Sequence, residues 1–129
     1  MASGQNFTYS AAQLRGTYLT DAAITLQYAI VKAATDGDVQ TAGSGEQVFG
    51  VAQDVYGSGV DASVVNSGPT VARIASGSIN AGVYVKAAAN GYVTLATTAD
   101  IAIGKTLAAA SGTNAQVPIY FFGHDVTAP

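Results

Sequence analysis

The feature that most constrains the fold is a stretch of sequence that occurs twice, 54 positions apart, as at Val31 and Val85. The matching pairs, which need no gap, include Val31 with Val85, Lys32 with Lys86, Ala33 with Ala87, Gly37 with Gly91 and Gly50 with Gly104. A chance match is the alternative, because the chain is rich in Ala, Val and Gly. The lysine and the turn residues match as well, so the repeat predicts two copies of one structural element.

The centre of each copy predicts a β-hairpin. Asp36-Gly37 in the first copy lies over Asn90-Gly91 in the second, and both dipeptides favour the positive φ angles of a type I′ turn. We therefore expect strands over 28–35 and 38–42, and again over 83–89 and 92–97. This pattern specifies structure and carries no chemistry of its own.

Composition predicts a protein that works in an assembly. The 129 residues are enough for one domain with a modest core. About half of them are apolar, mostly Ala and Val, and only 10% are charged, where soluble domains have roughly a quarter. Such a surface predicts that part of it is covered by copies of the chain or by a larger structure.

Charge and cysteine content argue against several classes of function. The net charge is −3 and the five Lys and Arg are scattered, so no basic patch for nucleic acid is expected. The absence of cysteine excludes disulfides and thiolate metal sites. The first residues lack the pattern of a signal peptide, and no apolar run is long enough for a membrane helix. We expect a soluble protein made in a cytoplasm.

Residues 1–21 differ from the rest and predict an extended N-terminal arm. Their larger side chains are spaced irregularly among Ser, Thr, Gln and Gly, with too few apolar residues for a core and too many for a solvated tail. An ordinary first strand or a frayed terminus is the alternative. The residues expected to dock this arm on a partner, such as a neighbouring subunit, are Phe7, Tyr9, Leu14, Arg15 and Tyr18.

Residues 22–129 predict a single β domain that contains the hairpin repeat (28–50 and 82–104). Short stretches of alternating or continuous apolar residues are separated by turn residues at regular spacing. Gly68-Pro69 is expected to separate two strands, and Pro118 predicts an edge position or a bulge. Nine or ten short strands predict an all-β fold, an antiparallel β-sandwich or β-tulip-like barrel.

No pattern in the sequence indicates an active site, so we expect no enzyme, no cofactor and no metal. His124-Asp125 pairs an imidazole with a carboxylate, but a serine completes a triad only if the fold supplies it. Asp36 and Asp38 lack the later ligands of a calcium loop, and a hairpin turn explains them. Gly43-Ser44-Gly45 lacks the lysine of a phosphate loop. Aromatic residues of the strands are expected as core or cross-strand pairs.

Several of these segments form a larger pattern. It consists of an apolar strand ending in Val-Lys-Ala, an Asp-Gly or Asn-Gly turn, and the strand Val48-Phe-Gly-Val-Ala-Gln53. Together with the segment 77–86 and the last strand around Ile119, it resembles the small capsid decoration, or cement, proteins of tailed bacteriophages. The likeness covers roughly 24–123. Such proteins also carry arms, although the arm here is longer and less charged than is typical.

The resemblance implies a β-sandwich or β-tulip-like body, usually a homotrimer, on the outer capsid surface of the virion. It implies the major capsid protein as partner, stabilisation of the expanded head and no catalysis. A carbohydrate- or receptor-binding β module of a phage fibre or surface array is the alternative, with a groove lined by Tyr56, Tyr84 and Tyr92. An enzyme would rest on His124 alone.

Overall fold

A computed structural model of the chain describes residues 13–129, apart from the side chain of Asp125. Almost all regular structure in this part is β-strand, so the all-β prediction is confirmed. The strands are β2 (Leu14–Leu19), β3 (Ile30–Ala33), β4 (Val39–Thr41), β5 (Gly50–Ala52), β6 (Asp61–Arg73), β7 (Ser78–Ile79), β8 (Tyr84–Ala87), β9 (Val93–Leu95), β10 (Ile101–Thr106), β11 (Ala110–Ser111) and β12 (Gln116–Thr127). A 3₁₀ turn, η1 (Ala89–Gly91), joins β8 to β9.

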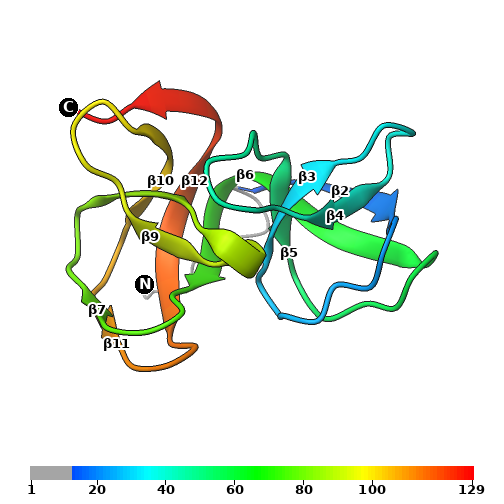
Figure 1. Cartoon of the computed structure of the whole chain (residues 1–129), viewed down its shortest axis with the longest axis horizontal. Coiled ribbons are helices and arrows are strands. Elements are labelled where there is room, and N and C mark those ends of the chain that lie inside the picture. Colours follow the sequence, from blue (N-terminus) through cyan, green and yellow to red (C-terminus); the bar gives the residue numbers. More distant parts are fainter. Residues whose placement is uncertain (1–12) are drawn as a thin grey trace, which may run out of the picture.

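Nine of these strands form one curled antiparallel sheet, a half-barrel, in the order β4-β3-β5-β6-β12-β10-β8-β9, with β2 paired to β6. The short strands β7 and β11 pair separately. Figure 1 shows β2 to β5 gathered on one side and β7 to β12 on the other, with β6 running from one side to the other. The long strand β6 therefore joins the two sides, pairing with β2 and β5 on one side and with β12 on the other.

The strand pairing repeats along the chain with the same spacing as the sequence. In the first copy Val31 pairs with Thr41 and Gly50, and in the second Val85 pairs with Leu95 and Gly104. The two copies therefore share one hydrogen-bonding register, which a chance likeness between Ala- and Val-rich segments would not produce.

The structural repeat extends beyond the hairpins. Leu14 of β2 pairs with Ser67 of β6, and Gly68 and Phe121, each 54 positions later, pair with one another between β6 and β12. Isolated parallel bridges repeat in the same way, between Thr20 and Val39 and between Ile74 and Val93. We call residues 14–67 unit 1 and residues 68–129 unit 2, whose last eight residues extend beyond the 54-residue repeat. Each unit has an opening strand, a hairpin, a fourth strand and a closing strand.

Strand β6 closes unit 1 and opens unit 2, which differs from the break expected at Gly68-Pro69. The strand continues through both residues, and Gly68 has a φ of 104°. Its first half pairs with β2, and its second half pairs with β12. The glycine bends the strand where its partner changes, because a positive φ strains other residues there.

The two hairpin turns differ in type. Asn90 and Gly91 have φ angles of 61° and 82°, as the predicted type I′ turn requires. In the first hairpin only Gly37 has a positive φ, 89°, and its N–H donates to the carbonyl of Ala34 at 3.0 Å. In both hairpins the last ladder hydrogen bond, from Ala34 N–H to the Asp38 carbonyl and from Ala88 N–H to the Tyr92 carbonyl, encloses three residues, one more than predicted.

Two hydrophobic clusters lie on opposite faces of unit 1. One, enclosed by unit 1 itself, contains Ile24, Ala29, Val31, Val39, Ala52, Ala62 and Val64. The larger cluster combines Ile30, Ala42 and Val51 from the other face of unit 1 with residues of unit 2, among them Phe121. Both faces of the unit 1 sheet are thus buried, and unit 1 covers the core of unit 2.

Two predictions about particular segments are changed by the structure. Leu14–Leu19, expected in the arm, forms β2 and belongs to the sheet of unit 1, whereas Phe7 and Tyr9 lie outside the described residues. Pro118 lies in β12, a central strand and not an edge strand. It is tolerated there because β10 ends beside it, with the N–H of Leu107 donating to the Pro118 carbonyl at 2.8 Å.

Candidate functional site: an exposed aromatic face

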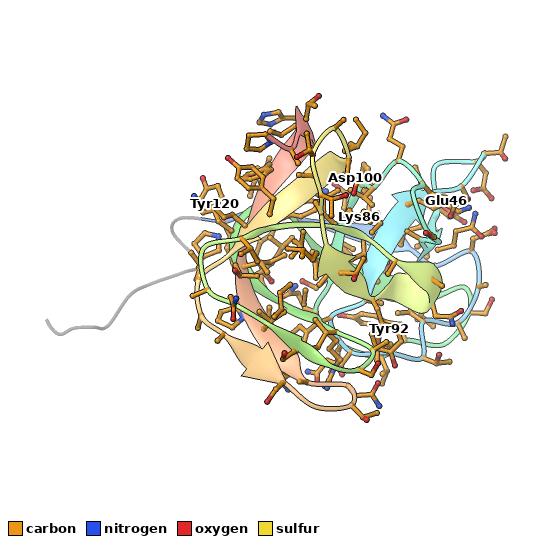
Figure 2. All side chains as sticks on the ribbon, turned by 60° about the vertical axis from the view of Figure 1, so that its left-hand side comes forward. Glu46, Lys86, Tyr92, Asp100 and Tyr120 are labelled. Atoms are coloured by element: carbon orange, nitrogen blue, oxygen red, sulfur yellow. The ribbon has the colours of Figure 1, made fainter. Side chains whose placement is uncertain are left out.

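The outer face of unit 2 carries a row of aromatic side chains. On β12, Phe121 points into the core and is 1% exposed, whereas Tyr120 on the opposite face is 47% exposed. The ring of Phe122 lies 5.9 Å from that of Tyr84 on β8 and 6.4 Å from that of Tyr120. Alternation along β12 brings these rings to the outside, and Figure 2 shows Tyr120 at the molecular surface.

A cation and an imidazole complete this face. Lys105 of β10 lies between β8 and β12, with its Nζ 5.4 Å from the centre of the Tyr84 ring. The His124 ring lies 6.3 Å from that of Phe122. We call Tyr84, Lys105, Tyr120, Phe122 and His124 the aromatic face. Amphipathic rings and a lysine stem can contact an apolar partner and still tolerate water.

His124 shows no catalytic arrangement in the described part of the chain. Its Nδ1 lies 3.1 Å from the carbonyl oxygen of Phe122, which is the hydrogen-bond partner found for the ring there. The side chain of Asp125 lies outside the described residues. The geometry around His124 thus gives no support for an enzyme of the Ser-His-Asp type.

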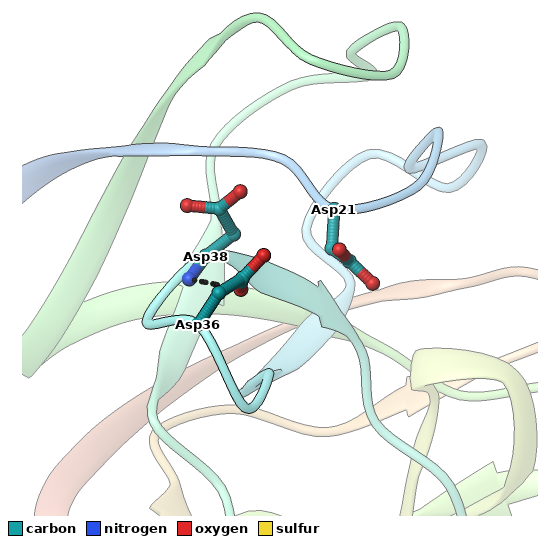
Figure 3. Close-up of side chains that lie close together, drawn as sticks. All are labelled: Asp21, Asp36 and Asp38. Carbon is teal, nitrogen blue, oxygen red and sulfur yellow. Dashed lines mark hydrogen bonds between the residues drawn. The ribbon is translucent and has the colours of Figure 1, made fainter.

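Three carboxylates meet at the tip of unit 1. Oxygens of Asp21, Asp36 and Asp38 lie within 4.8 Å of one another (Figure 3). Asp36 Oδ1 accepts the backbone N–H of Asp38 at 3.0 Å. Partial burial, followed by the charges of Asp36 and Asp21, raises the pKa of Asp38. We call these residues the acidic cluster. Two of them are exposed and one is half-buried, so the cluster offers a negative surface and no built metal site.

Each unit holds one lysine–carboxylate pair at the same repeat position. Lys32 Nζ lies 2.7 Å from Glu46 Oε2, and Lys86 Nζ lies 3.0 Å from Asp100 Oδ2. Each acid also accepts a backbone N–H from three residues earlier in its loop. The Gly43 N–H donates to Glu46 at 2.6 Å, and the Thr97 N–H donates to Asp100 at 2.8 Å. Figure 2 shows Lys86 and Asp100 together. These pairs fix loops and offer no reactive group.

The pair in unit 2 predicts a pH dependence of stability. The backbone N–H of Thr97, followed by the Lys86 ammonium, lowers the pKa of Asp100 to about 2. Because this pKa is below that of the unfolded chain, the stabilisation is present above about pH 4 and lost as the pH falls to about 2. Urea unfolding of the wild type and Asp100→Asn should therefore give a stability difference that shrinks over this window. A difference independent of pH would contradict this assignment.

The structure places the described arm residues on β2. Leu14 is 62% exposed, and the Arg15 guanidinium donates to the side-chain oxygen of Gln53 at 3.4 Å. The Tyr18 ring packs edge-on against Phe49 at 4.8 Å, so it already stabilises its own unit. Leu14 and Phe122 line one open cavity of about 470 Å³, which brings the start of β2 next to the aromatic face.

The tyrosines expected to line a glycan groove are not brought together. Tyr56 accepts the N–H of Ser63 at 3.1 Å within unit 1, and the hydroxyl of Tyr92 bonds to Asn114. Only Tyr84 belongs to the aromatic face. The sequence signal that could have found the face is the alternation of Tyr120, Phe122 and His124, which places their side chains together.

The fold has a counterpart among solved structures. No family model and no curated protein matches the sequence. No helix in the described residues is long and apolar enough to cross a membrane. The crystal structure of the head fiber gp8.5 N base of bacteriophage phi29 is similar, with a TM-score of 0.68 and 13% identity, over 88% of this chain and 98% of that one. Over nearly its whole length, the chain therefore has the fold of that head fiber base.

Proposed function

We propose that this chain is a structural protein of a tailed-phage virion, which binds the outer surface of the capsid and stabilises the expanded head. The fold likeness to a phage head fiber base over 88% of the chain is the observation that carries this proposal. The resemblance to decoration proteins over roughly 24–123 supports it from the sequence. The described surface adds loop-fixing ion pairs and an exposed aromatic face, which suit binding.

The physical properties of the chain suit this role. A protein that covers a capsid makes many identical contacts, and multivalency makes weak contacts firm. A continuous sheet built from two similar units opens locally less readily than separate loops do. Partners would be the major capsid protein and copies of the chain itself, expected from the resemblance to be three. The capsid-binding side chains would include Phe7, Tyr9, Leu14 and Arg15.

Sedimentation with phage heads tests the proposal. Purified protein is mixed with expanded heads and with unexpanded proheads of the source phage, and the pelleted fraction is titrated. We expect saturation on expanded heads at a fixed ratio to the major capsid protein. Folded protein that stays in the supernatant with both particles would contradict the proposal.

A deletion separates the arm from the body. Because β2 belongs to the sheet, the arm variant removes residues 2–12 and leaves Leu14–Leu19 in place. We expect normal unfolding by urea and weaker binding to heads. Full binding by this variant would show that residues 2–12 make no contact with the head. The proposal that the body binds the head would not be affected by that result.

A receptor- or carbohydrate-binding module of a fibre is the second candidate. It is favoured by the similarity to a head fiber protein, as opposed to a capsid decoration protein. This function predicts that the isolated protein binds glycans on an array, with loss of binding in Tyr120→Ala. The capsid-binding function predicts no glycan binding.

A further inference from the structure

We propose that the aromatic face binds a second copy of the chain head to tail, so that unit 2 of one copy packs against unit 1 of the next. This inference concerns self-association and does not depend on binding to a capsid. It rests on a comparison of the two units, on the side chains that differ between them and on their charges.

The equivalent face in unit 1 is already buried by a unit of the same fold. By strand pairing, the positions of Tyr84, Lys105 and Tyr120 correspond in unit 1 to Ile30, Val51 and Val65, each 0% exposed. Ile30 and Val51 pack into the core of unit 2. The chain thus shows what covers this sheet face when a neighbour of its own fold is present, whereas in unit 2 no residue of the described range 13–129 covers the same face to that degree.

The side chains on this face of unit 2 are those of an interface. A sheet face that stays in water carries polar residues, as in an ordinary one-sided antiparallel sheet. This face instead presents Tyr84, Tyr120 and Phe122, with the Lys105 ammonium over the Tyr84 ring. Tyrosine and phenylalanine are enriched at protein interfaces, because they give a large contact area and tolerate water in the free subunit.

Charge identifies unit 1 of the neighbour as the partner surface. Residues 13–67 contain six Asp and Glu against two Lys and Arg, whereas residues 68–129 contain two against three. Lys105 and the acidic cluster make no ion pair among the described residues, where the pairs found are Lys32–Glu46 and Lys86–Asp100. A head-to-tail contact places Lys105 near Asp21, Asp36 or Asp38 and relieves the repulsion among these carboxylates.

The contact between copies is made by side chains and does not continue the sheet. Inside the chain, Gly45 N–H donates to the Ala87 carbonyl and ties unit 1 to unit 2. At the corresponding position of unit 2, the N–H of Ala99 is already bonded to the carbonyl of Ala128. Because a head-to-tail contact joins different surfaces, the copies close into a ring or extend as a filament.

Sedimentation velocity of the full chain over a concentration series tests the proposal. We expect the wild type to associate, and Lys105→Glu and Tyr120→Lys each to weaken association roughly tenfold or more. Leu95→Lys is the matched control, since Leu95 is 49% exposed and lies on β9 outside the aromatic face. It should associate like the wild type. Urea unfolding verifies that each variant is folded.

A charge exchange tests the head-to-tail geometry. Asp38→Lys in the Lys105→Glu background should restore association, because it forms the attractive pair again with the two charges exchanged. Added salt should weaken both this restored association and that of the wild type. Wild-type protein that stays monomeric at every concentration would overturn the proposal and leave residues 1–12 or a virion partner to cover the face. Association unaffected by Lys105→Glu and Tyr120→Lys would overturn it as well.

Discussion

Gly50→Ala and Gly104→Ala are each expected to lower the free energy of unfolding by roughly 2–4 kcal/mol. These glycines occupy the same repeat position, where the fourth strand of each unit meets the closing strand. A Cβ at Gly50 would lie 2.3 Å from Val64 Cγ1 and 2.7 Å from the Val65 carbonyl oxygen. At Gly104 it would lie 2.8 Å from the Tyr120 carbonyl oxygen. A backbone oxygen in a central strand cannot move aside without breaking ladder bonds.

Gly57→Ala is the matched control for these variants. A methyl group added at Gly57 would meet no atom within 4 Å, and the φ of Gly57 is not positive. Its replacement should therefore change stability by less than about 0.5 kcal/mol. Equilibrium unfolding in urea measures all three variants. Equal stability of Gly50→Ala and Gly57→Ala would mean that the strands are further apart than described.

Phe121→Ala is expected to destabilise the chain by about 3–5 kcal/mol and to abolish folding if its stability is typical of a small domain. Phe121 is 1% exposed and is the largest fully buried side chain in the described core. It packs in the cluster that joins unit 2 to unit 1. Its loss therefore leaves a cavity where the two units meet, and surrounding strands on both sides prevent collapse around it.

The neighbouring residue on the same strand supplies the control. Tyr120 is 47% exposed on the opposite face, so Tyr120→Ala should cost less than about 1 kcal/mol in dilute solution. Thermal unfolding of both variants measures the contrast. Similar losses at the two positions would show that the aromatic face is as buried as the core, and that β12 is oriented differently.

The parts of the fold that could be predicted are those with local causes. Asn90-Gly91 specifies its turn through backbone preference alone, and it forms the predicted type I′ turn. The alternating Val-rich stretches indicated strands, because the period of two is a property of the local sequence. The predicted strand break at Gly68-Pro69 was wrong because it, too, was inferred from local preference alone. Both residues usually end a strand, but here they bend one whose two halves have different partners.

The candidate site could not be predicted because it depends on long-range packing. Ile30 and Tyr84 hold the same position in two similar hairpins, and either could be core or surface. Unit 2 lies over Ile30, whereas nothing in the described chain covers Tyr84 to the same degree. The expected groove of Tyr56, Tyr84 and Tyr92 failed for this reason, since a list of tyrosines does not state which face of the sheet each one occupies.

The most direct test of the proposed function is a difference map between expanded heads with and without the protein, measured by electron cryomicroscopy. We predict added density on the outer capsid surface at one symmetry-related set of positions, into which the two-unit body fits. Heads incubated with saturating folded protein that show no added density would contradict the assignment as a capsid-binding virion protein.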